Sequence, residues 1–160
     1  MAERVSSTEL DDDSPLLDLA AEEAVVGVAL ARPGLLDVIG AVSDADFAYP
    51  RLAACWRMCA MMRDKGAAPS ALTIGSFLQR GEAAAGQENS DAASYLNDLA
   101  LQAPTTEHEA RACAERVRDL SARRRLAWIH QAALGDAAEP QPDETPAELV
   151  ARAIEALQSA

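Results

Sequence analysis

The sequence predicts an all-α fold, with a small globular helical head followed by a long helical hairpin. Of its 160 residues, 49% are hydrophobic but only 4% are aromatic, so the core must be built from aliphatic side chains and alanine. Alanine and leucine are good helix formers, and clusters of the β-branched residues that favour strands are few. Apolar residues recur at the helical spacing i, i+3, i+4, i+7 in several segments.

The N-terminal part of the chain is expected to form a tail and then the head. Residues 1–14 are polar, include three consecutive aspartates and have little to bury, so a disordered acidic tail is predicted. The head is expected over residues 15–104. Its first helix is predicted to start at Ser14 and Pro15, an N-cap followed by a first-turn proline, and to end near Ala31.

Four further helices are predicted in the head, each bounded by a glycine, a proline or a cluster of capping residues. Gly66 is expected to end one of them in the left-handed conformation, Gly81 another, and Pro104 the last. The predicted helices cover residues 35–42, 50–65, 73–80 and a segment around 95–99.

Gly27 lies inside the apolar pattern of the first predicted helix. A glycine at such a position costs about 1 kcal/mol relative to alanine. The usual reason for a glycine there is the close approach of another backbone. We therefore expect Gly27 to mark a contact between two helices of the head.

The hairpin is expected over residues 105–160. Thr106 and Glu109 have the spacing of a capping box, which predicts the start of a long helix that runs to about Leu134 and stops at Gly135. An acidic connector is expected over 136–145, before a last helix that carries its own cap, proline and glutamate signals. A hairpin hides one stripe of each helix, so any remaining apolar surface predicts self-association.

Charge and cysteine content limit the partners and the compartment. The formal net charge of −12 argues against direct DNA binding and against an anionic membrane surface, and favours a basic protein partner. No apolar run is long enough to cross a membrane. Three cysteines without CxxC spacing, and no signal peptide, indicate a reduced, cytoplasmic protein. Two of them, Cys55 and Cys59, lie in an apolar stripe and are expected in the core.

No candidate active site emerges from the sequence. Phosphate-binding glycine loops, HExxH and GxSxG are all absent. His108 and His130 are too far apart on one predicted helix to share a metal. Glu22 and Glu23 are adjacent on a helix and diverge by about 100°, so they are expected to solvate one face rather than to form a catalytic pair. No metal, cofactor or enzymatic activity is predicted.

A run of arginines is the one basic feature of the chain. Arg118, Arg123, Arg124 and Arg125 lie on the long hairpin helix. They are predicted either to contact a partner or to form a solvated helix face with internal ion pairs, and the acidic remainder of the chain favours the second interpretation. Arg124 follows Val117 by seven residues, which places it near the apolar stripe and predicts a buried ion pair or an interface contact.

Several short motifs follow one another in a specific order and resemble a known family. They are Ala20 to Gly27 in the first helix, Asp46-Phe47, Gly66 to Pro69 with Thr73, Tyr95-Leu96 with Leu99 and Pro104, and Val117-Arg118 with Arg124. Together they resemble the N-terminal domain of DnaB-type replicative DNA helicases over about residues 15–130. The chain departs from that pattern at Ala20, where the family has a glutamate, and at Leu52, where it has a histidine.

This resemblance implies a non-catalytic role in assembly. In that family, heads and hairpins pair between subunits into a collar, a trimer of dimers, to which primase docks. The resemblance thus implies a homo-oligomer, a dimer or a trimer of dimers, with primase or another replication protein as partner. The residues it implies for self-association are Val117, Leu120, Trp128, Leu149, Ile154 and Leu157.

The Walker motif of the helicase motor is absent from these 160 residues, so ATPase and unwinding activity are not carried over to them. Two functions stay open at this point. One is the oligomerisation and partner-docking domain of a replicative helicase, which acts in DNA replication. The alternative is a free-standing regulator or loader that binds a resident replicative helicase.

Overall fold

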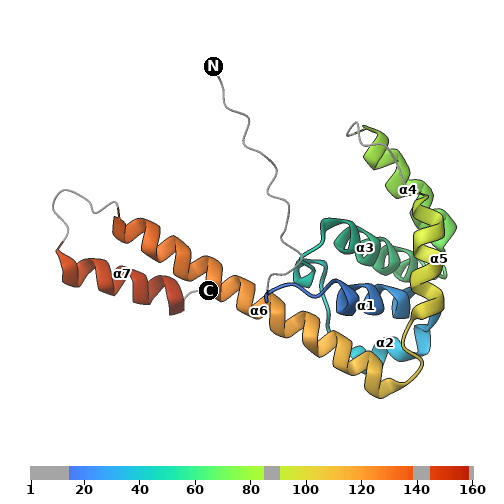
Figure 1. The fold of residues 1–160 in the computed structure, drawn as a ribbon, viewed down its shortest axis with the longest axis horizontal. Helices are drawn as coiled ribbons and strands as arrows, with labels where there is room; N and C mark the ends of the chain where they lie inside the picture. Colours follow the sequence, from blue (N-terminus) through green and yellow to red (C-terminus); the bar gives the residue numbers. More distant parts are fainter. Residues whose placement is uncertain (1–14, 85–90, 139–144, 159–160) are drawn as a thin grey trace.

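The computed structural model describes residues 15–84, 91–138 and 145–158, and within these ranges every regular element is helical. This confirms the all-α prediction. A head forms one end of the molecule, and a hairpin of two helices projects from it (Figure 1). The elements are α1 (Leu19–Ala31), η1 (Pro33–Leu35), α2 (Leu36–Ile39), η2 (Asp44–Asp46), α3 (Pro50–Asp64), α4 (Ala71–Ala84), α5 (Ala92–Gln102), α6 (Glu107–Ala138) and α7 (Pro146–Gln158), where η marks a short 3₁₀ helix.

Helix α1 is the centre of the head, because α3, α5 and α6 all pack against it. Its consecutive residues Val25 and Val26 are both fully buried, as is Val28. A helix that is apolar on all sides is covered on all sides. The side chains that cover it come from α3, α5 and α6, and among them are Leu52, Cys55, Cys59, Leu96, Leu99, Ala110, Ala114 and Val117.

Gly27 lies where α5 comes closest to α1, which confirms the predicted helix–helix contact. A methyl group built on Gly27 would overlap the backbone carbonyl oxygen of Leu99 and press on the side chain of Ala103. Only a residue without Cβ allows the two backbones this separation.

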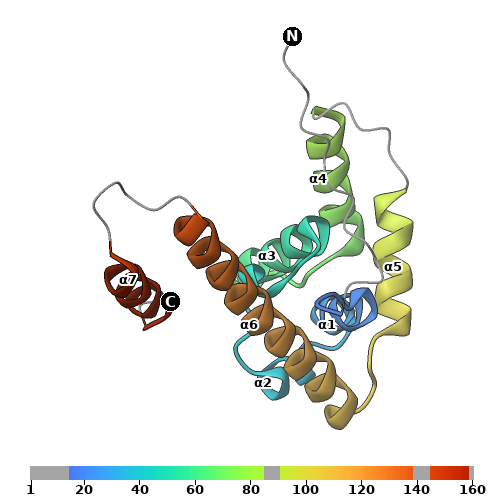
Figure 2. The same cartoon turned by 60° about the vertical axis from the view of Figure 1, so that its left-hand side comes forward.

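The first half of α6 contributes to the core of the head. Ala110, Ala114 and Val117 are at most 1% exposed and pack within the main core. The second half of α6 extends away from the head, and α7 folds back beside it (Figures 1 and 2). The head and the hairpin therefore share one helix of 32 residues.

Most of the predicted helix boundaries are confirmed by local contacts. Thr106 and Glu109 form the expected capping box, with the Thr106 hydroxyl donating to the Glu109 carboxylate at 2.9 Å. Thr145 and Glu148 do the same at 2.7 Å before α7. Gly66 has a φ of +71°, as the end of α3 requires.

Four predicted boundaries were wrong. Helix α1 starts at Leu19, because the carboxylate of Asp18, rather than Ser14, accepts the backbone N–H of Ala21 at 3.0 Å. Helix α2 ends at Ile39, before the predicted end at residue 42. The other two errors are predicted stops: α4 continues through Gly81 to Ala84, and α6 continues through Gly135 to Ala138. A helical glycine costs only about 1 kcal/mol, and the helix-forming residues that follow each of these two allow the helix to continue.

Residues 1–14 and most of the predicted connector, 139–144, lie outside the described part of the chain, and so do residues 85–90. None of the described helices is both long enough and apolar enough to span a lipid bilayer.

Candidate protein-interaction surfaces

The side chain of Arg124 points from α6 into the head, as its position near the apolar stripe predicted. Its guanidinium donates to the backbone carbonyl of Leu16 at 2.9 Å and to that of Asp46 at 2.5 Å. It also lies 3.9 Å from the carboxylate of Glu22, which is 2% exposed. The arginine therefore neutralises a buried acid and joins two loops of the head to the middle of α6.

Glu22 is buried, which corrects the prediction that it solvates a helix face. Its carboxylate accepts the backbone N–H groups of Ala48 at 2.7 Å and of Tyr49 at 3.1 Å, just before α3 begins. Burial raises the pKa of Glu22, although the two backbone hydrogen bonds and the charge of Arg124 oppose that rise. Glu22 thus holds the start of α3 against α1.

Asp46 is the second acid of this cluster, and it is 8% exposed. It accepts the Ser43 backbone N–H at 2.9 Å and the Ser121 hydroxyl of α6 at 2.9 Å. Burial acts to raise its pKa, but the hydrogen bonds from Ser43 and Ser121 and the charge of Arg125 outweigh it, so the pKa of Asp46 is lowered. Asp46 thus remains ionised at neutral pH.

The other arginines of the run also have partners within the chain. Arg118 donates to the carbonyl of Ile39 at 3.0 Å. Arg123 pairs with Asp119 one turn earlier, at 3.0 Å. Arg125 lies 3.5 Å from the Asp46 carboxylate and remains 68% exposed. Each of these three arginines thus has a hydrogen-bond or ion-pair partner within the same chain.

The sequence did not predict that Glu22 and Asp46 are the acids that pair with Arg124 and Arg125. The position of Arg124 in the apolar stripe predicted a buried ion pair but named no partner. Ser43 and Asp46 form a capping box at the start of η2. Nothing in the sequence indicated that Asp46 also bonds Ser121, which is 75 residues away along the chain.

The outer half of α6 carries an apolar face that no described part of the chain covers. Ser121 is 2% exposed and lies against the head. Trp128 follows it by two helical turns on the same face and is 71% exposed. Leu126 on α6, and Val150 and Ile154 on α7, are also between 49% and 60% exposed. Leu126 precedes Trp128 by two residues and therefore lies on nearly the opposite side of α6. We define Trp128, Val150 and Ile154 as the hairpin patch.

The six predicted self-association residues do not lie together. Val117 and Leu120 are each 1% exposed within the single chain, so they have no surface to offer a second copy. Trp128 and Ile154 are exposed and lie in the hairpin patch. The side chains of Leu149 and Leu157 lie outside the described part.

The described residues offer no assembled chemistry. Among them, no three His, Cys, Asp or Glu side chains come together where they could hold a metal ion. Cys55 and Cys59 are buried in the core as expected. Burial, aided by neighbouring Cys55, raises the pKa of Cys59 to about 12, so this thiol stays protonated and unreactive.

Comparison with known proteins agrees with this architecture. None of the curated proteins matches the chain. Among solved structures, the chain is similar to the N-terminal domain of DnaB helicase from Mycobacterium tuberculosis, at 25% identity and a TM-score of 0.69, with 92% of this chain and all of that one covered. The family model described as "DnaB-like helicase N terminal domain" matches residues 14–119. The chain therefore belongs to the DnaB-like helicase N-terminal domain family.

Proposed function

We propose that this chain is the oligomerisation and partner-docking module of a replicative DNA helicase and that it performs no catalysis itself. Its membership of the family supports a role in DNA replication. The observation that carries the proposal is the change in exposure along one face of α6, from 2% at Ser121 to 71% at Trp128. The same face packs on the head in its first half and is open in its second.

The open face suits a second copy of the chain. Exposed tryptophans are rare on monomers and frequent at the energetic centres of interfaces. Val150 and Ile154 are one turn apart on α7, beside the same half of α6. A dimer that pairs two hairpin patches would remove Trp128 from water, and it is the unit from which a trimer of dimers could be built.

Sedimentation equilibrium tests the self-association. The double variant Trp128→Asp and Ile154→Asp is expected to be monomeric at concentrations where the unmodified chain is dimeric or larger, because each carboxylate would lose its hydration in the interface. Leu72→Asp is the matched control, since Leu72 is 69% exposed but lies on α4. An unmodified chain that stays monomeric at high concentration would refute the proposal.

Docking of a replication protein is the second part of the proposal. The net charge of −12 favours a more basic partner, and primase is the first to test. Co-sedimentation with a cognate primase fragment is expected to give a complex whose stability falls as salt rises. A primase fragment that never co-sediments, even at low salt, would remove primase as the partner.

A further inference from the structure

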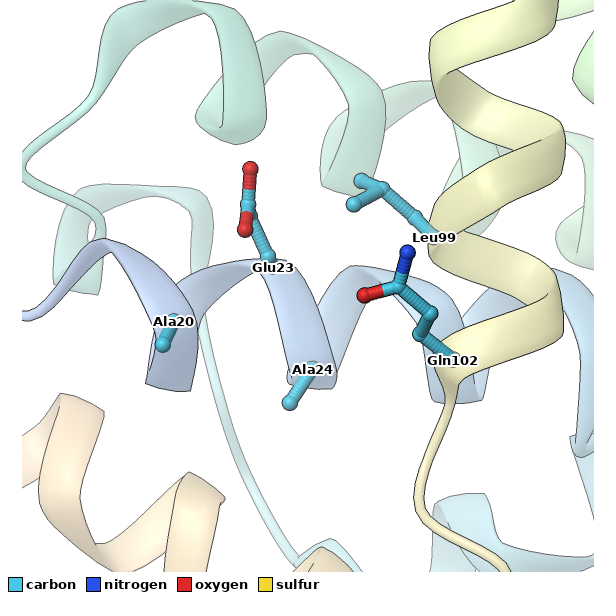
Figure 3. A pocket seen from close by; sticks show the side chains of 5 residues that line it. All are labelled: Ala20, Glu23, Ala24, Leu99 and Gln102. Atoms are coloured by element: carbon cyan, nitrogen blue, oxygen red, sulfur yellow. The ribbon is translucent and has the colours of Figure 1, made fainter.

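Two adjoining cavities lie between α1, α5 and the start of α6, at the end of the molecule opposite α7 (Figure 1). The smaller has a volume of about 110 Å³ and is lined by α1 and α5, with Gln102 reaching from α5 toward Ala24 (Figure 3). The larger, of about 430 Å³, extends from Ala24 along the end of α5 to Thr105 and Glu109. Because Ala24 and Gln102 line both cavities, we treat them as one groove, the α1/α5 groove.

Small apolar residues make this groove possible. Ala20 and Ala24 lie one turn apart on α1, and Ala103 lines the far side. Beside them, Leu101 is 80% exposed, more than any other large apolar side chain in the described residues. The groove therefore combines small apolar side chains with polar ones, and it includes a leucine that the folded monomer leaves in water.

The groove is flanked by carboxylates held in fixed positions. Glu23 accepts the hydroxyl of Tyr95 at 2.6 Å, and Glu109 accepts the hydroxyl of Thr106 at 2.9 Å. The hydrogen bonds from Thr106 lower the pKa of Glu109, so it stays ionised. Neither cavity has a Lys or Arg among its described lining residues.

We propose that the α1/α5 groove docks one helix of a partner protein, a helix whose apolar stripe covers Leu101 and whose flanking Lys or Arg side chains meet Glu23 and Glu109. This inference rests on the docking role proposed above and assigns that role to a face distant from the hairpin patch. A second copy of this chain is assigned to the hairpin patch in the proposed function, so the groove is assigned to a different protein. A basic amphipathic helix matches both the exposed Leu101 with its neighbouring alanines and the carboxylates of Glu23 and Glu109.

A fluorescence anisotropy titration of the full chain tests the groove. The probe is a labelled synthetic 18-residue peptide with leucines at helical spacing and lysines elsewhere; the same peptide with glutamates for lysines controls for charge. Leu101→Ser and Ala24→Arg are each expected to weaken binding by about tenfold, as loss of a central interface contact does. Glu109→Gln, which keeps the capping box, is expected to weaken binding less and to flatten its salt dependence. Leu72→Ser is the matched control and is expected to change nothing.

Three outcomes would overturn this assignment. One is binding of the lysine peptide that neither Leu101→Ser nor Ala24→Arg reduces. Another is an equal loss in Leu72→Ser, which would indicate non-specific attraction to the acidic surface. The last is a Leu101→Ser variant that loses the oligomer but still binds the peptide. That result would show that a second copy of the chain, and not a partner helix, occupies the groove. A chain that binds the peptide through the groove but sediments as a monomer would retain this inference and refute the proposed self-association.

Discussion

At the scale of single residues, a small buried polar cluster fixes the place where α6 leaves the head. Glu22 accepts a hydrogen bond from the backbone N–H of Ala48, and Asp46 accepts one from that of Ser43. From α6, Ser121 donates to the Asp46 carboxylate and Arg124 to the Asp46 carbonyl. A buried carboxylate is tolerated only when its charge and its acceptor sites are satisfied. Each member of this cluster therefore depends on the others.

Arg124 is expected to matter far more for stability than its neighbour in sequence. Arg124→Ala leaves Glu22 buried without this counter-charge and removes the guanidinium hydrogen bonds to two backbone carbonyls, so we expect a loss of about 2–3 kcal/mol in the free energy of unfolding. Arg123→Ala, which removes only an exposed pair one turn apart, should cost less than about 0.5 kcal/mol. Urea unfolding measures both, and equal effects would contradict the described role of Arg124.

The two buried acids are expected to give opposite pH dependences. Asp46 has a folded pKa below its ordinary value of 3.8, so the stability it contributes is present above that pH and is lost as pH falls through the lowered pKa. Glu22 has a folded pKa above 4.5, so its contribution is present below that pH and is lost as pH rises through the raised pKa.

Urea unfolding from about pH 3 to about pH 7 separates these two effects. Asp46→Asn should remove part of the acid-side loss of stability, and Glu22→Gln should remove part of the loss toward neutral pH. Both substitutions also break hydrogen bonds, so the pH slope rather than the absolute stability is the test. An unchanged slope in both variants would refute the assigned shifts.

Gly27 and Gly81 are both helical glycines, but they are expected to respond oppositely to the same substitution. Gly27→Ala places a methyl group on the Leu99 carbonyl and should cost about 1–3 kcal/mol, because α5 must move away from α1. Gly81→Ala meets nothing within 4 Å and should stabilise α4 by about 0.5–1 kcal/mol. Thermal unfolding of both variants measures the contrast, and destabilisation by Gly81→Ala would contradict it.

At the scale of elements, α6 is two structures in one helix. Its first half completes the core of the head, while its second half and α7 form the projecting hairpin (Figure 2). Apolar residues at helical spacing occur in both halves, so the sequence pattern alone does not show where the head ends. The change becomes visible only in the contacts that α6 makes with α1, α2 and η2.

The two halves of α6 predict different results for the same substitution. Leu120→Asp buries an unpaired charge in the head and should unfold it, with loss of helical circular dichroism. Trp128→Asp should keep the helical signal and affect only association. A folded Leu120→Asp variant would contradict the packing described for the first half.

The sequence predicted helices and caps better than contacts between distant elements. Capping boxes at Thr106 and Thr145 and the left-handed Gly66 depend on neighbours in sequence, and all three were predicted correctly. The stops at Gly81 and Gly135 failed because a lone glycine weakens a helix without ending it. The burial of Glu22 depends on backbone groups 26 and 27 residues away, which no local pattern reveals.

At the scale of the whole molecule, the described structure joins a head with a continuous apolar core to a hairpin whose outer face is open. The head pairs its buried acids, while Leu72, Phe77 and Leu101 stay exposed on its surface. The hairpin patch stays open, and Trp128 is its most exposed member. The central claim of the proposed function is that a second copy of the chain covers this patch.

The fluorescence of Trp128 tests that claim most directly. The chain has two tryptophans, and the other one, Trp56, is 6% exposed and donates its indole N–H to the Val42 carbonyl. Spectra of Trp128→Phe, subtracted from those of the unmodified chain at equal concentration, isolate the emission of Trp128. We predict that this emission shifts to the blue, and that its quenching by acrylamide falls, as protein concentration rises through the association range. Emission that stays red and fully quenchable at every concentration, including those at which sedimentation shows an oligomer, would contradict the account.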